Sequence, residues 1–251
     1  MRKLLTAAVL TSAVAIAAPA SAGQVWLDNQ HSNYSGSGQT YTFTGSDGVV
    51  VRASAWSVDA GGIIRAATLG VWDQGLGVDN SSRSGADNSH TIDNTGWQDF
   101  VVLQFNKVVD LGNAQFNTGW DSYNDTDATI GFANSALPFG TNPAWNGVSD
   151  SVLNALNLYS SNAGSGWSGA SGNSNRDINT AGNTGNLWLI GASFNNPDRS
   201  ADGFKLEKLT FDVVTPAVPE PATWLMMILG FGLIGGMLRS QRRENLSVSY
   251  S

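Results

Sequence analysis

Short runs of β-branched and aromatic residues, each bounded by glycine, asparagine or aspartate, recur along most of this chain. The clearest runs are GVVVRASAWSV, GGIIRAATLGVW and DFVVLQFNKVVDL, and AQFNTGW, ATIGFA, LWLIGASF and FKLEKLTFDVV follow. Such runs predict strands, because these side chains favour extended backbone and the bounding residues favour turns. We therefore predict an all-β body over residues 23–214, an antiparallel, jelly-roll-like β-sandwich of about eight or nine strands in two packed sheets.

Two local patterns refine this prediction. Val49, Val51, Ala53 and Ala55 alternate with more polar neighbours, which predicts a strand with its core face on these four residues. The stretch NGVSDSVLNALNLYSS has apolar residues nearer helical spacing, and a serine or aspartate at 149–150 can cap a helix. It predicts a single short surface helix.

The start of the chain, over positions 1–22, has the pattern of a secretory signal peptide. Arg2 and Lys3 precede an apolar stretch, and the small-residue sequence ASA ends at Ala22. Signal peptidase recognises this combination, so we expect it as a processing partner that cleaves after Ala22.

The composition changes abruptly after Val214. Residues 215–221 contain three prolines, which cannot continue a sheet and predict an extended linker. The linker ends in the triplet Pro219-Glu220-Pro221.

An uncharged apolar run follows over residues 222–238. At about 1.5 Å rise per residue, a helix of this length reaches only the lower limit for a bilayer span. Arg239, Arg242 and Arg243 come next, and positive residues stay on the cytoplasmic side of a membrane. We therefore predict a single transmembrane helix over 222–238 and a basic cytoplasmic tail over 239–251.

The tail as a whole, PEPATWLMMILGFGLIGGMLRSQRR, resembles the PEP-CTERM sorting signal of exported proteins in Gram-negative bacteria, in its PEPxxWxMMxxGFGxxG form. In that family an exosortase, a membrane-embedded cysteine-dependent enzyme, recognises the triplet and cleaves near it. The resemblance implies that Pro219, Glu220 and Pro221 are the recognition element and that an exosortase is a partner. It also implies that the inner membrane holds the chain only transiently, before the chain reaches the cell surface or the exterior.

A central segment, residues 75–133, resembles exosortase-dependent surface proteins that carry this tail. The matching pieces are GLGV, HTIDN, DFVVLQF with VVDL, and GW before an acidic run. The resemblance brings no catalytic activity with it. It implies a surface or extracellular-matrix role, and we expect this role to be associated with exopolysaccharide or a biofilm matrix.

The body between Gly23 and Pro216 is acidic, with 18 acidic and 8 basic side chains and a net charge of −10. Nucleic acid is therefore excluded as a partner, because phosphate binding needs clustered cations. The chain has no cysteine, which excludes disulfides and thiolate metal sites.

Aspartates concentrate in two stretches, and hard cations such as Ca²⁺ prefer several oxygen ligands. The weak calcium candidates are Asp87, Asp93 and Asp99 in the first stretch and Asp121, Asp125 and Asp127 in the second. The second stretch lacks the glycine and the terminal glutamate of an EF-hand loop. Structural turns are the alternative interpretation of both stretches, and no other cofactor is expected.

Aromatic residues in polar surroundings raise the possibility of glycan binding. Trp120, Trp145 and Trp167 lie in or beside polar stretches, where an exposed ring can stack on a sugar. Packing in the core or at its rim is the alternative role for each ring.

Enzyme motifs are not found. The sequence has no G-x-S-x-G, no H-E-x-x-H and no phosphate-binding glycine loop, and its only histidines are His31 and His90. We therefore expect an exported, noncatalytic surface or matrix protein. The alternatives are a glycan-binding secreted module and, less favoured, a polysaccharide-active hydrolase that uses two carboxyl groups.

Overall fold

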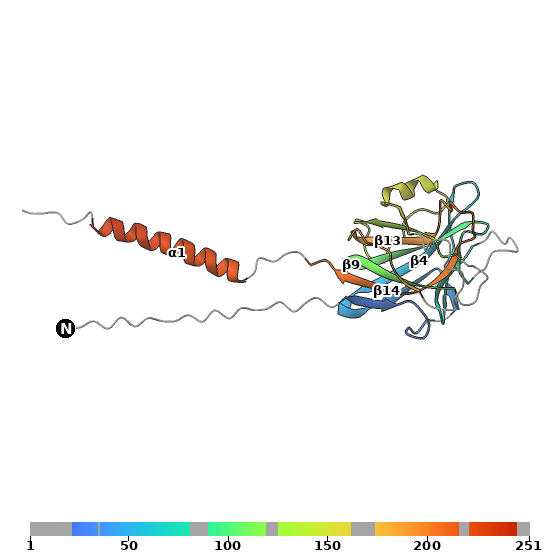
Figure 1. Ribbon diagram of the computed structural model, residues 1–251, viewed down its shortest axis with the longest axis horizontal. Helices are drawn as coiled ribbons and strands as arrows, with labels where there is room; N and C mark the ends of the chain where they lie inside the picture. The colour runs from blue at the N-terminus through green and yellow to red at the C-terminus, as the bar shows by residue number, and fades with distance from the viewer. Residues whose placement is uncertain are drawn as a thin grey trace, which may run out of the picture. The chain divides into compact units, whose positions relative to one another are not determined.

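The structure of the chain is a computed structural model, which describes residues 22–34, 36–80, 90–118, 125–161, 174–215 and 221–244 (Figure 1). The chain divides into two compact units, Met1–Val214 and Thr215–Ser251. The predicted signal peptide lies outside the described residues except for Ala22, and so does most of the proline-rich linker.

The first unit is built almost entirely of strands, fourteen of which join one sheet in the described part of the chain. Their bounds are β1 (Gly23–Trp26), β2 (Gly36–Gly38), β3 (Thr40–Thr44), β4 (Val50–Val58), β5 (Ile64–Ala66), β6 (Thr68–Trp72), β7 (Gly75–Asp79), β8 (Ile92–Asp93), β9 (Gln98–Asn117), β10 (Ala128–Ala133), β11 (Tyr159–Ser161), β12 (Ser174–Asp177), β13 (Thr184–Ala192) and β14 (Gly203–Val213). All the strand pairs are antiparallel. The prediction of an all-β body is confirmed.

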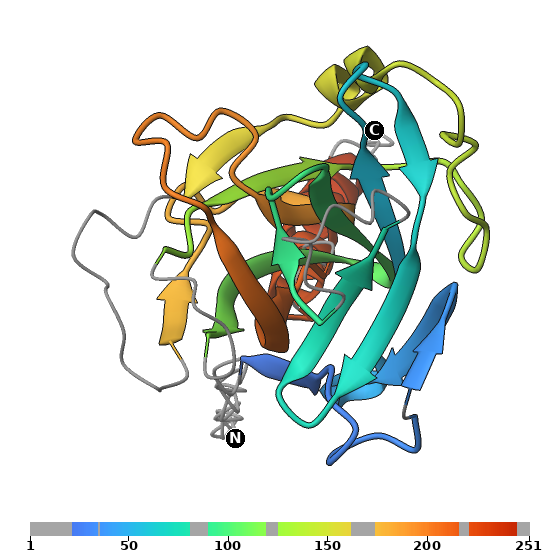
Figure 2. The ribbon, with the colours of Figure 1, turned by 90° about the vertical axis from the view of Figure 1, so that its right-hand side faces the viewer.

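The predicted division into two separate sheets is wrong, because β9 belongs to both parts of the structure. The strand is 20 residues long. Its first half pairs with β4 on one side and β13 on the other, and its second half pairs with β14 and β12. Register shifts in the pairing of β9 with β13 and with β14 mark β-bulges, which bend and twist strands. The result is one continuous sheet whose strands curl around a common interior (Figure 2).

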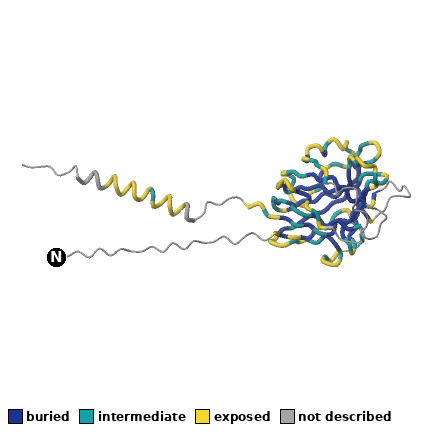
Figure 3. The backbone as a smooth tube through the Cα atoms, viewed as in Figure 1, coloured by how far each residue is buried: buried dark blue, intermediate teal, exposed yellow. Residues whose placement is uncertain are grey.

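The larger of two apolar clusters fills that interior. Figure 3 colours the buried residues of the chain dark blue, and they lie inside the first unit. Val49, Val51, Ala53 and Ala55 all belong to it, so the core face predicted from the alternating pattern is confirmed. A smaller cluster contains Trp56, on the opposite face of β4. The strand is therefore covered on both faces.

A short helix covers this second face. It is the 3₁₀ helix η2 (Asp150–Ala155), so the predicted surface helix is confirmed in place but has the tighter 3₁₀ geometry. The Ser149 hydroxyl caps it by accepting a hydrogen bond from the Ser151 N–H at 3.3 Å. Leu153 and Leu156 turn inward and pack in the smaller cluster. A second 3₁₀ turn, η1 (Ser46–Gly48), joins β3 to β4.

The second unit contains one helix in its described part, α1 (Pro221–Glu244). Among the described residues, no helix reaches both the length and the apolar character that a bilayer crossing requires. The transmembrane helix predicted over residues 222–238 is therefore not supported.

Candidate metal centre and sorting segment

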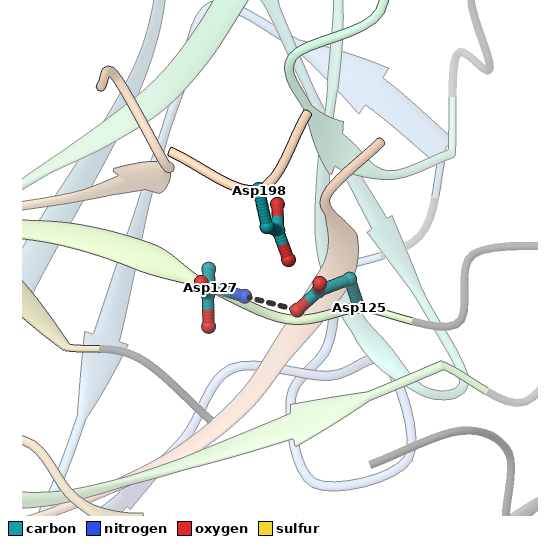
Figure 4. Close-up of side chains that lie close together, drawn as sticks. All are labelled: Asp125, Asp127 and Asp198. Carbon is teal, nitrogen blue, oxygen red and sulfur yellow. Dashed lines mark hydrogen bonds between the residues drawn. The ribbon is translucent and has the colours of Figure 1, made fainter. Parts of the chain in front are cut away.

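Three carboxylates gather at one place on the first unit. Asp125, Asp127 and Asp198 each offer an oxygen atom, and these atoms all lie within 4.8 Å of one another. Figure 4 shows Asp198 reaching toward Asp125 from a separate segment of the chain. Two of these three residues, Asp125 and Asp127, come from the second calcium stretch that the sequence indicates.

Backbone hydrogen bonds fix the two segments against each other. The Gly203 N–H donates to the Asp125 carbonyl at 3.1 Å, and the Ser193 N–H donates to the Asp127 carbonyl at 3.0 Å. An isolated parallel bridge also joins Asp125 to Asp202. The start of β10 is thereby attached to both ends of the turn between β13 and β14.

The turn itself follows from its polar sequence, NNPDRSAD. Asn196 and Arg199 have positive φ angles of 21° and 63°, and asparagine tolerates this region better than most residues. The Asn196 Nδ2 donates to the Ser200 carbonyl at 2.6 Å, and the Ser200 N–H donates to Asp198 Oδ1 at 3.0 Å. These local bonds place the exposed Asp198 beside the two buried aspartates.

A fourth carboxylate, Asp202, lies fully buried next to this group. Its Oδ2 accepts a hydrogen bond from Asn94 Nδ2 at 2.6 Å, whereas its Oδ1 is buried and has no hydrogen-bond partner. Burial, together with the negative charge of Asp125, raises the pKa of Asp202 to about 7. Burial and the neighbouring Asp127 also raise the pKa of Asp125.

One guanidinium, that of Arg176 on β12, lies near three of these carboxylates, Asp125, Asp127 and Asp202. Burial lowers the pKa of Arg176 to about 10, against the attraction of the aspartates. Its Nη2 donates to the Thr126 carbonyl at 2.8 Å, and its guanidinium lies 4.5 Å from the centre of the Phe116 ring.

The remaining calcium candidates lie elsewhere or outside the described residues. Asp93 accepts hydrogen bonds from the Thr91 hydroxyl and the Thr95 N–H, both at 2.9 Å. Asp99 lies in a buried hydrogen-bond network, and neither residue belongs to the carboxylate group. Asp87 and Asp121 fall outside the described residues.

Sequence reasoning missed Asp198 and Asp202. They follow Asp125 and Asp127 by about 70 residues, in a stretch whose composition is typical of an ordinary turn. The pairing of β10 with β13 brings the two segments together in the fold. The density of Asn, Asp and Pro in NNPDRSAD is the one signal that marks the stretch.

Of the three tryptophans considered for glycan stacking, only Trp145 is described. It is half-buried, and its ring centre lies 5.9 Å from that of Trp56 in an edge-to-face arrangement. Packing is its visible role. Trp120 and Trp167 lie outside the described residues.

The sorting segment is described in part. Pro219 and Glu220 lie outside the described residues, and Pro221 is the first residue of α1. Arg239, Arg242 and Arg243 fall within the last turns of the helix. Proline suits the first position of a helix, because its missing N–H has no partner there in any case.

Comparison with known families identifies this segment: residues 217–243 match the family model of the PEP-CTERM protein-sorting motif. No curated protein and no solved structure matches the chain. The match confirms the resemblance of the tail to the PEP-CTERM sorting signal, and it implies an exported protein that an exosortase processes and that is sorted to the cell surface.

Proposed function

We propose that this chain is an exported, noncatalytic protein of the cell surface or the extracellular matrix, where it associates with exopolysaccharide. The observation that carries the proposal is the PEP-CTERM motif at residues 217–243, placed after an all-β unit that ends at Val214. The motif directs delivery, and the β unit is the cargo.

The contacts of the two histidines support a noncatalytic role. His31 Nδ1 lies 2.9 Å from Asp28 Oδ2, and the His31 ring stacks on Trp26 with ring centres 4.0 Å apart. The His90 ring packs edge-to-face on Trp72 at 4.4 Å. Both rings therefore take part in packing, which is consistent with the proposed noncatalytic role.

The sorting part of the proposal is tested by replacing Pro219, Glu220 and Pro221 with alanine in the native host. Intact mass spectrometry and surface biotinylation would then follow the chain. We expect the parent protein to lose its C-terminal segment and become surface-accessible, whereas the variant keeps the segment and stays inaccessible.

A matched control places three alanines at Asn245, Leu246 and Ser247, downstream of the arginines. This control should be processed like the parent. Equal processing of the triple variant and the parent would refute sorting through the triplet.

A second candidate function, glycan binding, is favoured by an open depression of about 520 Å³ on the first unit. Phe132 and Tyr159 line it together with Asn157, Thr180 and Asn183. Aromatic faces beside amide and hydroxyl groups are the chemistry that binds sugars, by stacking and by hydrogen bonds.

The two candidates differ in whether the purified chain binds polysaccharide. A glycan array and pull-down with the host's own exopolysaccharide would compare the parent with Asn157→Ala, which removes an exposed amide from the rim. Binding that falls several-fold in this variant supports glycan recognition at the depression. Asn134→Ala, an exposed asparagine that does not line the depression, is the matched control.

A further inference from the structure

We propose that Asp125, Asp127 and Asp198 bind one Ca²⁺ ion, which joins the start of β10 to the turn between β13 and β14. This inference is independent of the sorting motif and of the depression considered for glycans. It concerns what stabilises the folded β unit.

The geometry of the three carboxylates fits a single ion. Ca²⁺ binds oxygen at about 2.4 Å, so two oxygens on opposite sides of one ion lie about 4.8 Å apart. The candidate oxygens all fall within 4.8 Å of one another, which is the limit set by one coordination shell. They come from two segments that are distant in the chain, so an ion at their centre would cross-link the fold.

A second observation points to a cation at this place. Asp202 is fully buried, an isolated bridge joins its backbone to that of Asp125, and its Oδ1 has no hydrogen-bond donor. In the same turn, the buried Oδ1 of Asn196 also has no donor. Both unsatisfied atoms are oxygens, and buried oxygens without donors require either a proton donor or a cation.

Arg176 does not fill this role. Its guanidinium donates to Thr126, through Nη2 to the carbonyl at 2.8 Å and through Nη1 to the hydroxyl at 3.4 Å. No direct ion pair joins Arg176 to an aspartate among the described residues. The arginine therefore lowers the local negative potential without forming an ion pair with Asp125 or Asp198.

The donor set selects the kind of ion. All the candidate ligands are carboxylate or amide oxygens, without a nitrogen or sulfur ligand, which suits Ca²⁺ and not Zn²⁺ or Cu²⁺. Mg²⁺ keeps most of its waters and commonly takes only one or two carboxylates, so three carboxylates on one ion favour Ca²⁺.

The test uses the full chain, treated with EGTA and dialysed, and titrated with CaCl₂ and with MgCl₂ in a calorimeter. Thermal unfolding is recorded in parallel with and without about 5 mM CaCl₂, above the dissociation constants usual for extracellular calcium modules. We expect one Ca²⁺ per chain and a rise in melting temperature of about 5 °C or more.

Two variants test the site. Asp198→Asn changes an exposed turn residue and should weaken Ca²⁺ binding at least tenfold while the far-UV circular dichroism stays unchanged. Asp202→Asn should also weaken binding, and it should raise the melting temperature in EGTA, because it removes a buried charge. Asp212→Asn, an exposed aspartate far along β14, makes the same charge change and should bind Ca²⁺ like the parent.

Three results would overturn the proposal. One is a chain that shows neither binding heat nor a change in melting temperature with CaCl₂. Another is Ca²⁺ binding that both Asp198→Asn and Asp202→Asn leave intact, since the ion would then occupy another place. The third is Mg²⁺ binding as tight as Ca²⁺ binding, which would contradict the choice of ion.

Discussion

The hydroxyl of Ser57 donates a hydrogen bond of 2.6 Å to Oδ1 of Asp99, and both side chains are fully buried. The two residues are partners in the pairing of β4 with β9, and Asn80 Nδ2 donates to the same oxygen at 2.8 Å. A buried carboxylate costs free energy unless it is hydrogen-bonded, so these two bonds to Oδ1 reduce the cost of burying Asp99 near the start of β9. Asp99 thus has a structural role in the visible network, although the sequence offers it as a calcium ligand.

Replacement of Ser57 by alanine should therefore destabilise the fold. The substitution leaves a buried carboxyl oxygen of Asp99 short of one donor, which costs about 1–3 kcal/mol. Urea unfolding followed by tryptophan fluorescence would measure the loss. Ser160→Ala, at an exposed position of β11, makes the same chemical change and should alter stability by less than about 0.5 kcal/mol. Equal losses in the two variants would mean that the Ser57 hydroxyl contributes nothing specific.

A close backbone approach at Gly77 of β7 supports a second prediction. A Cβ atom there would overlap the carbonyl carbon and oxygen of His90, and these backbone atoms cannot move aside as a flexible side chain can. Gly77→Ala should destabilise the protein by about 3 kcal/mol through overpacking.

The control for this variant is Gly112→Ala on β9, where the nearest atom to an added Cβ is the Thr210 carbonyl oxygen at 3.9 Å. This variant should unfold within about 1 kcal/mol of the parent. Urea unfolding would compare the two. A Gly77→Ala protein as stable as Gly112→Ala would show that β7 can separate from the segment at His90 at little cost.

The strands were predictable because their signal is local. Alternation at Val49, Val51, Ala53 and Ala55 reports which face of one strand is buried, and this needs only neighbouring residues. The role of β9 was not predictable, because its 20-residue run looks like two strands or one until its partners are known. Only pairing between distant segments decides whether the sheets are separate or continuous.

The candidate metal centre shows the same limit. Aspartate density at Asp125 and Asp127 marks one half of the site, whereas Asp198 and Asp202 read as turn residues. The pattern of residues in one segment can indicate oxygen ligands within that segment. It does not indicate which distant segment will lie beside it, because that depends on how the strands pair. The sorting motif could be identified from the sequence alone, because its residues are contiguous in the chain.

Trp145 supports a third prediction, which separates packing from glycan stacking. Its half-buried ring meets Trp56 edge-to-face, in the smaller apolar cluster. Trp145→Ala should therefore lower the free energy of unfolding by about 2–3 kcal/mol and leave any glycan binding per folded molecule unchanged. Trp145→Phe retains an aromatic edge and should recover at least half of the loss in urea unfolding. If Trp145→Ala were as stable as the parent but lost glycan binding, then Trp145 would serve sugar stacking and not packing.

Glu207 supports a prediction about pH. Its side chain is only 8% exposed, and its Oε2 accepts hydrogen bonds from Gln115 Nε2 at 2.9 Å and Asn117 Nδ2 at 3.3 Å. Burial raises the pKa of Glu207 above its usual value, with the negative charge of Asp28 acting in the same direction and the two amide donors opposing it. The folded protein therefore holds this proton to higher pH than the unfolded chain does.

A group that binds its proton more tightly in the folded state makes the fold less stable as pH rises from the unfolded pKa, about 4.3 for glutamate, through the raised folded pKa. Glu207→Gln stays neutral and can still accept both hydrogen bonds through its amide oxygen. The variant and the parent should be equally stable near pH 4, where the carboxyl is protonated, and the variant should be the more stable at pH 7. Urea midpoints at both pH values, with the exposed Asp150→Asn as a control for losing one negative charge, would measure the difference. If the advantage of Glu207→Gln is the same at pH 4 and pH 7, or reverses at pH 7, then burial of the ionised carboxylate does not limit the stability of this fold.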